Sequence, residues 1–270
     1  MFSKSFKRVF IAILMLLLGL SAMEAGAASV YVIGAGDPAE NTRVTDVLTG
    51  FGHSVTIGDV YSSFNNSASL VGHDVVLLMP NYSWGSDMPN DGQLALKNFV
   101  SAGGGLVTSE WTLWIMGQGR FSTLAEAIPA TSSGYYTSAS PTIYFQNETD
   151  SIINYNLPGA SYTFSLTNLS GTESRLTAKV GTHTFYTSSY GGSVNTGYSG
   201  LVGWDYGSGR VISFSTLIAE NELGNADYRQ LFSNAVNWAD QATPVPLPGA
   251  AFLFASGLSL AGFLRFKFRK

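Results

Sequence analysis

The sequence predicts an α/β domain, built as a mostly parallel sheet between two layers of helices with a β-rich extension. Three observations lead to this fold class. Apolar strand patterns alternate with helical patterns over residues 29–109, short alternating runs fill residues 135–206, and a buried strand and an amphipathic helix end the pattern at residue 240. Such alternation builds parallel sheets with right-handed crossovers, so we expect one domain over residues 28–243.

The first half supplies four expected strands, at residues 29–33, 54–57, 74–79 and 106–109. The third run is almost continuously apolar, which is typical of a parallel strand that is buried on both faces. Helical spacing over residues 39–51 and 93–100 fills two of the intervals, and the glycines at 103–105 end the second helix. This order of elements predicts a flavodoxin-like, three-layer arrangement.

The second half changes character. Residues 162–166, 175–180 and 183–186 are short alternating runs, which predict β-hairpins that extend the sheet at one edge or end. Residues 210–215 then predict another buried strand, and residues 227–240 a final amphipathic helix that returns the chain to its own sheet.

The N-terminal segment has the pattern of a secretory signal peptide over residues 1–27. Lys4, Lys7 and Arg8 precede an apolar stretch at residues 9–20, and the small residues Ala25 and Ala27 follow at the spacing of a signal peptidase site. An uncleaved membrane anchor is the alternative. We expect export, with signal peptidase as the first partner.

The C-terminal segment, residues 244–270, has the order of a sorting tail. Pro246 and Pro248 precede an uncharged stretch at residues 249–264, and four basic residues follow by position 270. The stretch is shorter than the roughly 20 residues of an ordinary membrane-spanning helix, and basic residues are preferentially kept on the cytoplasmic side. We therefore expect a transmembrane helix in the precursor that is removed later. A plain single-span anchor is the alternative.

The tail resembles the PEP-CTERM sorting signal in its Val-Pro-Leu-Pro variant, which is carried here by Val245, Pro246, Leu247 and Pro248. The resemblance implies cleavage by an exosortase-type processing enzyme. It also implies a Gram-negative host with an extracellular polysaccharide matrix, as in a biofilm. The expected location is therefore the inner membrane for the precursor, and the cell surface or extracellular matrix for the mature protein.

Composition excludes several classes of function. Without the two terminal segments the chain keeps 17 acidic residues against 7 basic ones, so no nucleic-acid partner is expected. The chain has no cysteine, which rules out disulfides and thiol chemistry. His53 and His73 precede strands and lie at the opposite edge from Glu110, so we expect neither a metal site nor a Ser-His-Asp triad.

Three stretches carry a resemblance in the domain: NFVSAGGGLVTSEW at residues 98–111, YGSGRVISFS at 206–215 and YRQLFSNAVNWA at 228–239. They resemble the class I glutamine-amidotransferase-like superfamily and, within it, the ThuA-like, trehalose-utilisation group. Working amidotransferases use a cysteine nucleophile, so glutamine hydrolysis by that route is excluded. ThuA-like proteins commonly carry a histidine after the Gly-Gly-Gly strand, and Glu110 stands at that position. The resemblance therefore implies the fold without an inherited catalytic role.

Ligands of open α/β sheets bind beyond the carboxyl ends of the strands. The side chains expected there are Asp37, Asn81, Tyr82, Trp84, Glu110, Trp111, Glu220 and Asn221. Aromatic rings beside carboxylates suit a sugar, and Glu110 with Glu220 or Asp37 would form the acid pair of a glycoside hydrolase. The structural alternative is that Glu110 and Glu220 bond loop backbones or cap helices, while Trp111 and Trp114 belong to the core.

A glycine motif at residues 34–39 also matches the dinucleotide fingerprint G-x-G-x-x-A. Asp37 before Pro38 is better explained as a helix N-cap, whose carboxylate would occupy the N–H groups that a pyrophosphate needs. We therefore expect no cofactor.

Two hypotheses of function remain. The first is an exported surface or matrix protein with a non-catalytic amidotransferase-like domain that binds carbohydrate, with extracellular polysaccharide as the partner. The alternative is a secreted carbohydrate-active hydrolase that uses paired carboxylates.

Overall fold

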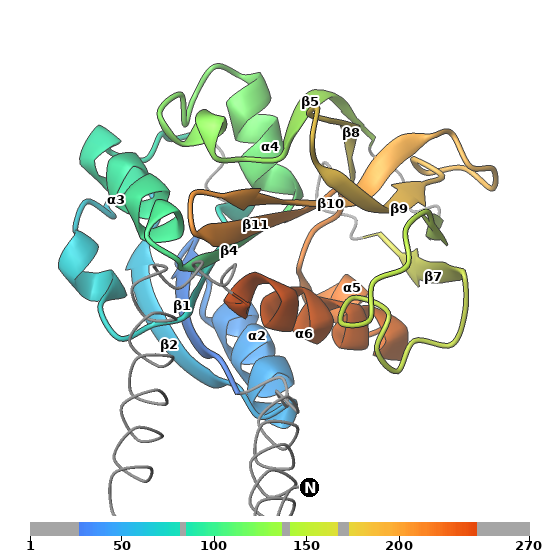
Figure 1. Cartoon of the computed structure of the whole chain (residues 1–270), viewed down its shortest axis with the longest axis horizontal. Coiled ribbons are helices and arrows are strands. Elements are labelled where there is room, and N and C mark those ends of the chain that lie inside the picture. The colour runs from blue at the N-terminus through green and yellow to red at the C-terminus, as the bar shows by residue number, and fades with distance from the viewer. Residues whose placement is uncertain (1–26, 82–84, 137–140, 167–172, 242–270) are drawn as a thin grey trace, which may run out of the picture.

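The computed structural model describes residues 27–81, 85–136, 141–166 and 173–241, which form one continuous sheet with helices on both faces (Figure 1). The helices are α2 (Pro38–Gly50), α3 (Asn90–Ser101), α4 (Glu110–Gly117), α5 (Glu220–Leu223) and α6 (Ala226–Asp240), with the 3-10 turns η1 (Ser67–Leu70) and η3 (Leu124–Glu126). The strands are β1 (Ser29–Gly34), β2 (Ser54–Val60), β3 (Val75–Leu78), β4 (Gly105–Thr108), β5 (Ala130–Tyr136), β6 (Pro141–Gln146), β7 (Ser161–Ser165), β8 (Glu173–Ala178), β9 (His183–Ser188), β10 (Tyr198–Tyr206) and β11 (Gly209–Phe214).

Five parallel strands form the α/β half, in the order β2-β1-β3-β4-β11. The register aligns the starts of the central strands, because Val75 pairs with both Val30 and Gly105, and Gly105 pairs with Arg210. This confirms the expected flavodoxin-like fold class. It also places all the carboxyl ends of these strands at one edge and all the amino ends at the other.

The β-rich extension continues the same sheet through antiparallel pairing. Strand β10 pairs with β11, and β9, β6 and β7 follow in order beyond it. Strand β8 pairs with β10 and with β5, which leaves the main path (Figure 1). The three expected runs are therefore strands, β7, β8 and β9, and they lie in an extension beyond the edge formed by β11. The expectation that consecutive runs form hairpins is wrong for β8 and β9, because β8 pairs with β5 and β10 and not with β9.

The sheet has an apolar core on each face, because alternate residues of a strand point to opposite sides. Val30 and Val32 of β1 pack with α2 and α6, whereas Tyr31 and Ile33 pack with α3 and α4. All four residues are buried. The two helix layers are visible on either side of the sheet in Figure 1.

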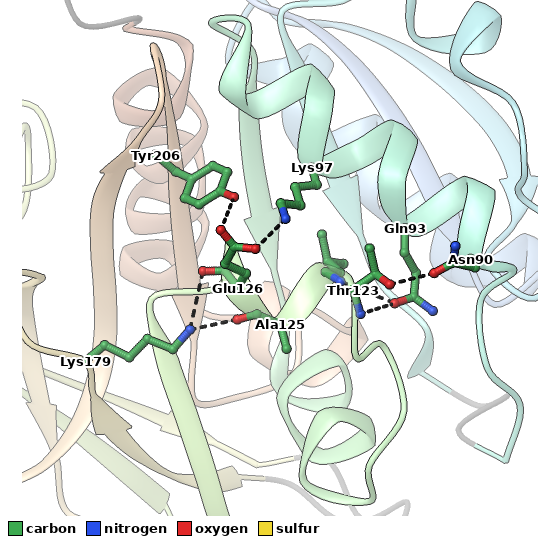
Figure 2. Close-up of polar contacts among 9 residues, drawn as sticks. Asn90, Gln93, Lys97, Thr123, Ala125, Glu126, Lys179 and Tyr206 are labelled. Atoms are coloured by element: carbon green, nitrogen blue, oxygen red, sulfur yellow. Dashed lines mark hydrogen bonds and ion pairs between the residues drawn. The ribbon is translucent and has the colours of Figure 1, made fainter.

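A polar network fastens η3 between α3 and the extension (Figure 2). The Glu126 carboxylate bonds the Lys97 ammonium of α3 and accepts from the Tyr206 hydroxyl of β10 at 3.1 Å. The Lys179 ammonium donates to the carbonyl oxygens of Ala125 and Glu126, at 2.7 and 3.5 Å. Segments that are far apart in sequence are thereby joined, which fixes the extension against the parallel half.

Within the described residues, no helix is both long and apolar enough to span a membrane. The predicted signal peptide up to residue 26 and the tail from residue 242 lie outside the residues that the structure describes. Both therefore remain predictions.

Candidate functional site

The carboxyl edge of the parallel strands contains a topological switch point, the position at which ligands bind in this fold class. From β1 the chain first builds β2 on one side and then crosses to β3 on the other, so the strand order reverses between β1 and β3. Ligands of doubly wound sheets bind at such a reversal. The segments that follow β1, β3, β4 and β11 all meet at this edge.

Asp37 caps helix α2 at this edge. Its Oδ1 accepts from the backbone N–H of Ala39 at 2.8 Å and of Glu40 at 3.4 Å, and Pro38 occupies the first helical position. The N-cap expected from the sequence is therefore confirmed. Its carboxylate uses the N–H groups that a pyrophosphate would need.

Glu40, one turn into α2, connects the ends of three strands. The Asn81 amide donates to both carboxylate oxygens of Glu40 at 3.0 Å, and Asn81 Oδ1 accepts from the Ser109 hydroxyl at 3.3 Å. Burial raises the pKa of Glu40 to about 7. The hydrogen bond from Asn81 lowers this pKa, and the charge of Asp37 raises it further. Asn81 thus lies at the edge, as expected, and it holds a buried acid.

Glu110 begins helix α4 directly after β4, and its side chain is fully enclosed. The residue is 0 % exposed, and neither carboxyl oxygen has a hydrogen-bond partner in the described structure. Burial raises its pKa well above the usual range, and the charges of Glu173 and Glu222 act in the same direction. The protonated acid is therefore favoured at this position.

Glu173, on β8 of the extension, reaches the same cluster and is bonded by hydroxyl groups. Thr142 and Ser215 donate to its carboxylate at 2.9 Å each, and Ser188 makes a third hydrogen bond. Burial raises the pKa of Glu173 to about 7, while these hydroxyl donors oppose the rise. The extension thus completes the edge of the parallel half.

Glu222 provides the third acid of this group, and Glu220 does not. Glu222 is fully buried on α5, whereas Glu220 and Asn221 are exposed on the same short helix. The structure therefore does not bring Glu220 or Asn221 to Glu110. Tyr82 and Trp84 lie outside the described residues.

Aromatic side chains lie next to the acids. Trp111 packs with Leu217 and Ala219 in a small apolar cluster and meets Trp114 edge to face, with ring centroids 5.3 Å apart. Trp114 in turn meets the half-exposed Tyr135, at 6.2 Å. Trp111 itself is only 7 % exposed, so it packs within this small apolar cluster and offers little surface to a ligand.

A second aromatic group approaches from the extension. The Arg175 guanidinium lies 5.4 Å from the ring centroid of Tyr198 and 6.0 Å from that of Tyr190. Burial raises the pKa of Tyr190; the Arg175 charge opposes this, and the charges of Glu173 and Glu110 reinforce it. The charges of the buried acids Glu173 and Glu110 therefore extend to the Tyr190 hydroxyl. Together the acids and rings suit a polyhydroxyl ligand, because rings stack on apolar sugar faces and acids bond hydroxyl groups.

Sequence reasoning missed six functional candidates: the acids Glu40, Glu173 and Glu222, and the aromatic residues Trp114, Tyr135 and Tyr190. The spacing of Asp37 and Glu40 matches a capping box, which could have marked Glu40 as a residue of the helix start. No local pattern marks Glu173, because strand pairing over a long sequence distance brings it to the edge. Among the described residues, no group of three or more His, Cys, Asp or Glu side chains is arranged to hold a metal ion.

A pocket of about 460 Å³ lies elsewhere, between the end of α6 and the extension. Its charged groups largely satisfy one another, because His183 pairs with Glu148 and Arg210 pairs with Asp205. It contributes nothing to the carboxyl edge.

Comparison with known proteins identifies the fold. No family model and no curated protein matches the chain. Among solved structures, a protein described as ThuA-like from Bacteroides uniformis matches with a TM-score of 0.57 at 14% identity, covering 81% of this chain and 94% of its own. A cytoplasmic protein of Salmonella typhimurium LT2 matches with a TM-score of 0.61 at 14% identity, covering 79% and 100%.

A third match, a cold-adapted β-galactosidase from Rahnella sp. R3, has a TM-score of 0.52 at 14% identity and covers 83% of this chain but 32% of the larger enzyme. At these identities the likeness concerns the fold alone. The domain therefore has the fold found in ThuA-like proteins.

Proposed function

We propose that this chain is an exported protein, delivered by its C-terminal tail to the surface of a Gram-negative cell, whose domain binds carbohydrate without hydrolysing it. The delivery part rests on the two terminal patterns, at residues 1–27 and 244–270. The fold does not by itself define an activity, so the binding part rests on the site.

One observation carries the choice of binding over hydrolysis: among the described residues, the acids that gather at the edge are enclosed, and the partly exposed Asp37 is engaged in capping α2. Glu110 and Glu173 are each 0 % exposed, and the exposed Glu220 does not approach them. Glycoside hydrolysis needs two carboxyl groups on either side of the scissile bond, about 5–9.5 Å apart according to the mechanism. Enclosed acids leave no room for a sugar between them, whereas Trp114, Tyr135 and Tyr190 are at least partly exposed and can meet one.

Hydrolysis remains the second candidate because of one feature of Glu173. An acid with a pKa of about 7 is suited to donate a proton near neutral pH. In that case opening of the edge would have to admit the sugar to Glu173. The β-galactosidase match does not decide the matter, since it concerns the fold alone.

A glycan-binding screen and a reducing-sugar assay on the purified chain test both candidates. We expect binding to at least one glycan without release of reducing ends. Tyr135→Ala should weaken binding about tenfold, as loss of one stacking contact would. Tyr155→Ala is the matched control, because Tyr155 is also exposed but lies on the segment after β6, where its carbonyl accepts from Asn234 of α6.

Release of reducing ends that Glu173→Gln abolishes would favour the hydrolase instead. Absence of both binding and hydrolysis would exclude both candidates. Surface labelling of intact cells tests delivery separately, and a protein found only inside the cell would contradict it.

A further inference from the structure

The start of the domain lies in an enclosed polar site at the amino edge of the sheet. Ala28 is 0 % exposed, and its backbone N–H donates to Nδ1 of His53 at 3.1 Å. His53 is itself buried, and its Nε2 lies 3.1 Å from the Ser233 hydroxyl of α6. Because Nδ1 accepts, the proton of a neutral ring must sit on Nε2 and point to Ser233. Burial lowers the pKa of His53, which favours this neutral acceptor form.

Two carboxyl groups complete the surroundings. Asp74 accepts from the backbone N–H of Ser29 at 2.8 Å, directly beside Ala28. Asp240, at the end of α6, has a pKa raised by burial and then by the charge of Asp74. Neither acid forms an ion pair with any residue that the structure describes. His73, whose Nδ1 lies 2.9 Å from the Ser29 hydroxyl, is the remaining titratable group at this point.

We propose that removal of the leader after Ala27 places the new α-ammonium group of Ala28 in this site, where His53 Nδ1 accepts one of its hydrogens and Asp74 and Asp240 balance its charge. This inference rests on the proposed export and on the predicted cleavage after residue 27, and it names the group that receives the mature N-terminus. Hydrolysis breaks the bond between the Ala27 carbonyl carbon and the Ala28 nitrogen. The hydroxyl of a water molecule goes to the carbonyl carbon, its hydrogen goes to the nitrogen, and a further proton from solvent gives the ammonium.

The physical gain comes from charge. The Ala28 nitrogen already bonds His53 as an amide, so cleavage need not move it. An ammonium group adds a positive charge one residue from the N–H group whose hydrogen bond Asp74 accepts, and Asp74 and Asp240 repel each other. A nearby opposite charge favours the charged forms of such groups. Burial alone would lower the pKa of this amino group, as it does for His53, and the two acids act in the opposite direction. The proposal requires the acids to outweigh burial, so that the pKa is higher in the folded protein than its usual value of about 8.

The test compares two chains that carry the same net charge. One runs from Ala28 to Lys270 and the other from Gly26 to Lys270, both kept in detergent, so only the position of the ammonium differs. We expect the Ala28 chain to melt about 2–4 °C higher at about pH 6.5. A group with a raised folded pKa stabilises below its unfolded pKa and loses the effect as pH rises through the folded value, so the difference should vanish by about pH 10.

Asp74→Asn provides the matched variant, because the asparagine oxygen can still accept from Ser29. Asp74→Asn should remove most of the difference in Tm between the two chains. Asp240→Asn should reduce the same difference, and it provides a second measurement if Asp74→Asn folds poorly. Equal Tm values for the two chains would overturn the proposal. So would a difference that survives both substitutions, or a mature protein from cells whose N-terminal residue is not Ala28.

These outcomes are separate from those of the proposed function. Failure to bind any glycan would leave the difference in Tm intact. Conversely, equal Tm values would leave glycan binding and surface delivery untouched.

Discussion

Burial of glutamates at the carboxyl edge makes stability depend on pH. Burial is the first cause of the raised pKa of Glu40, Glu110 and Glu173. An acid whose pKa is higher in the folded state than in the unfolded state stabilises fully below the unfolded pKa, and the effect is lost as pH rises through the folded pKa. For Glu173 a rise from 4.5 to about 7 corresponds to roughly 3 kcal/mol. The domain should therefore become less stable between about pH 4.5 and pH 8.

Replacing Glu110 with glutamine should flatten this dependence. The amide keeps the size of the side chain but cannot ionise. For each pH, we compare the free energy of unfolding of Glu110→Gln with that of the unchanged chain. We expect this difference to be more favourable to the variant at about pH 8 than at about pH 5, by about 1–3 kcal/mol. Urea denaturation at a series of pH values measures the slope.

Glu220→Gln is the control, because Glu220 is exposed. It should leave the slope unchanged. A slope in Glu110→Gln that equals that of the unchanged chain would show that folding does not raise the pKa of Glu110, and the account of the buried acids would then be wrong.

Single residues were predictable from sequence only where a local rule applies. Asp37 follows from its position before Pro38, and the placement of His53 and His73 at the amino edge follows from their position before strands. Glu222 could not be separated from Glu220 by pattern, because two positions on one four-residue helix differ only in which side chain the fold turns inward.

At the scale of elements, the glycines that lead from the end of α3 into β4, Gly103–Gly105, restrict which residues can stand in this stretch. Gly103 has a φ of 121°, which favours glycine at the end of a helix. A Cβ atom added to Gly105 would lie 2.6 Å from the carbonyl oxygen of Ala239, so α6 can pack against the start of β4 only without a side chain there.

Gly105→Ala should therefore destabilise the domain by about 1–3 kcal/mol, the usual cost of forcing an extra carbon into a packed site. Its neighbour is backbone and cannot move aside as a side chain could. Thermal or urea denaturation of the variant measures the effect.

Gly50→Ala is the matched control with the opposite sign. Gly50 ends α2, is exposed, and has no atom within 4 Å of an added Cβ. Alanine should stabilise the helix there by up to about 1 kcal/mol. If both substitutions change the free energy of unfolding equally, packing against Ala239 is not the reason that position 105 requires glycine.

Elements were largely predictable because strands and helices repeat with their own periods. The expected strand at residues 74–79 is β3, and the expected helix at 227–240 is α6. The pairing of β8 with β5 and β10 was not predictable, since hairpin patterns do not say which distant strand each one meets. The part of the site that depends on this pairing, Glu173, was missed for the same reason.

At the scale of the whole molecule, the described chain enters and leaves at the same edge of the sheet. Ser29 begins β1 beside Asp74, and Asp240 ends α6 close enough to Asp74 to feel its charge. The carboxyl-edge acids lie at the opposite ends of these strands, four to six residues away. If the chain is tethered through residues that follow Gln241, the candidate site faces away from the tether, where a ligand in the matrix can reach it.

The predicted sorting tail can be tested directly. Pro246 and Pro248 would hold the segment before the apolar stretch in an extended form, which a processing enzyme needs in order to reach the backbone. An uncharged stretch of about 16 residues is short for a permanent anchor, so cleavage near Val245 is the expected outcome.

Replacing both prolines with alanine should trap the precursor in the membrane, because a continuous helix would then draw the cleavage segment toward the bilayer. We expect mass spectrometry to find residues 249–270 missing from the surface-associated protein and present in the variant. Replacement of Leu258 by alanine is the control, since it lies within the apolar stretch and leaves the prolines in place. Recovery of the peptide that ends at Lys270 from the mature, unsubstituted protein would contradict the sorting tail and favour a plain anchor.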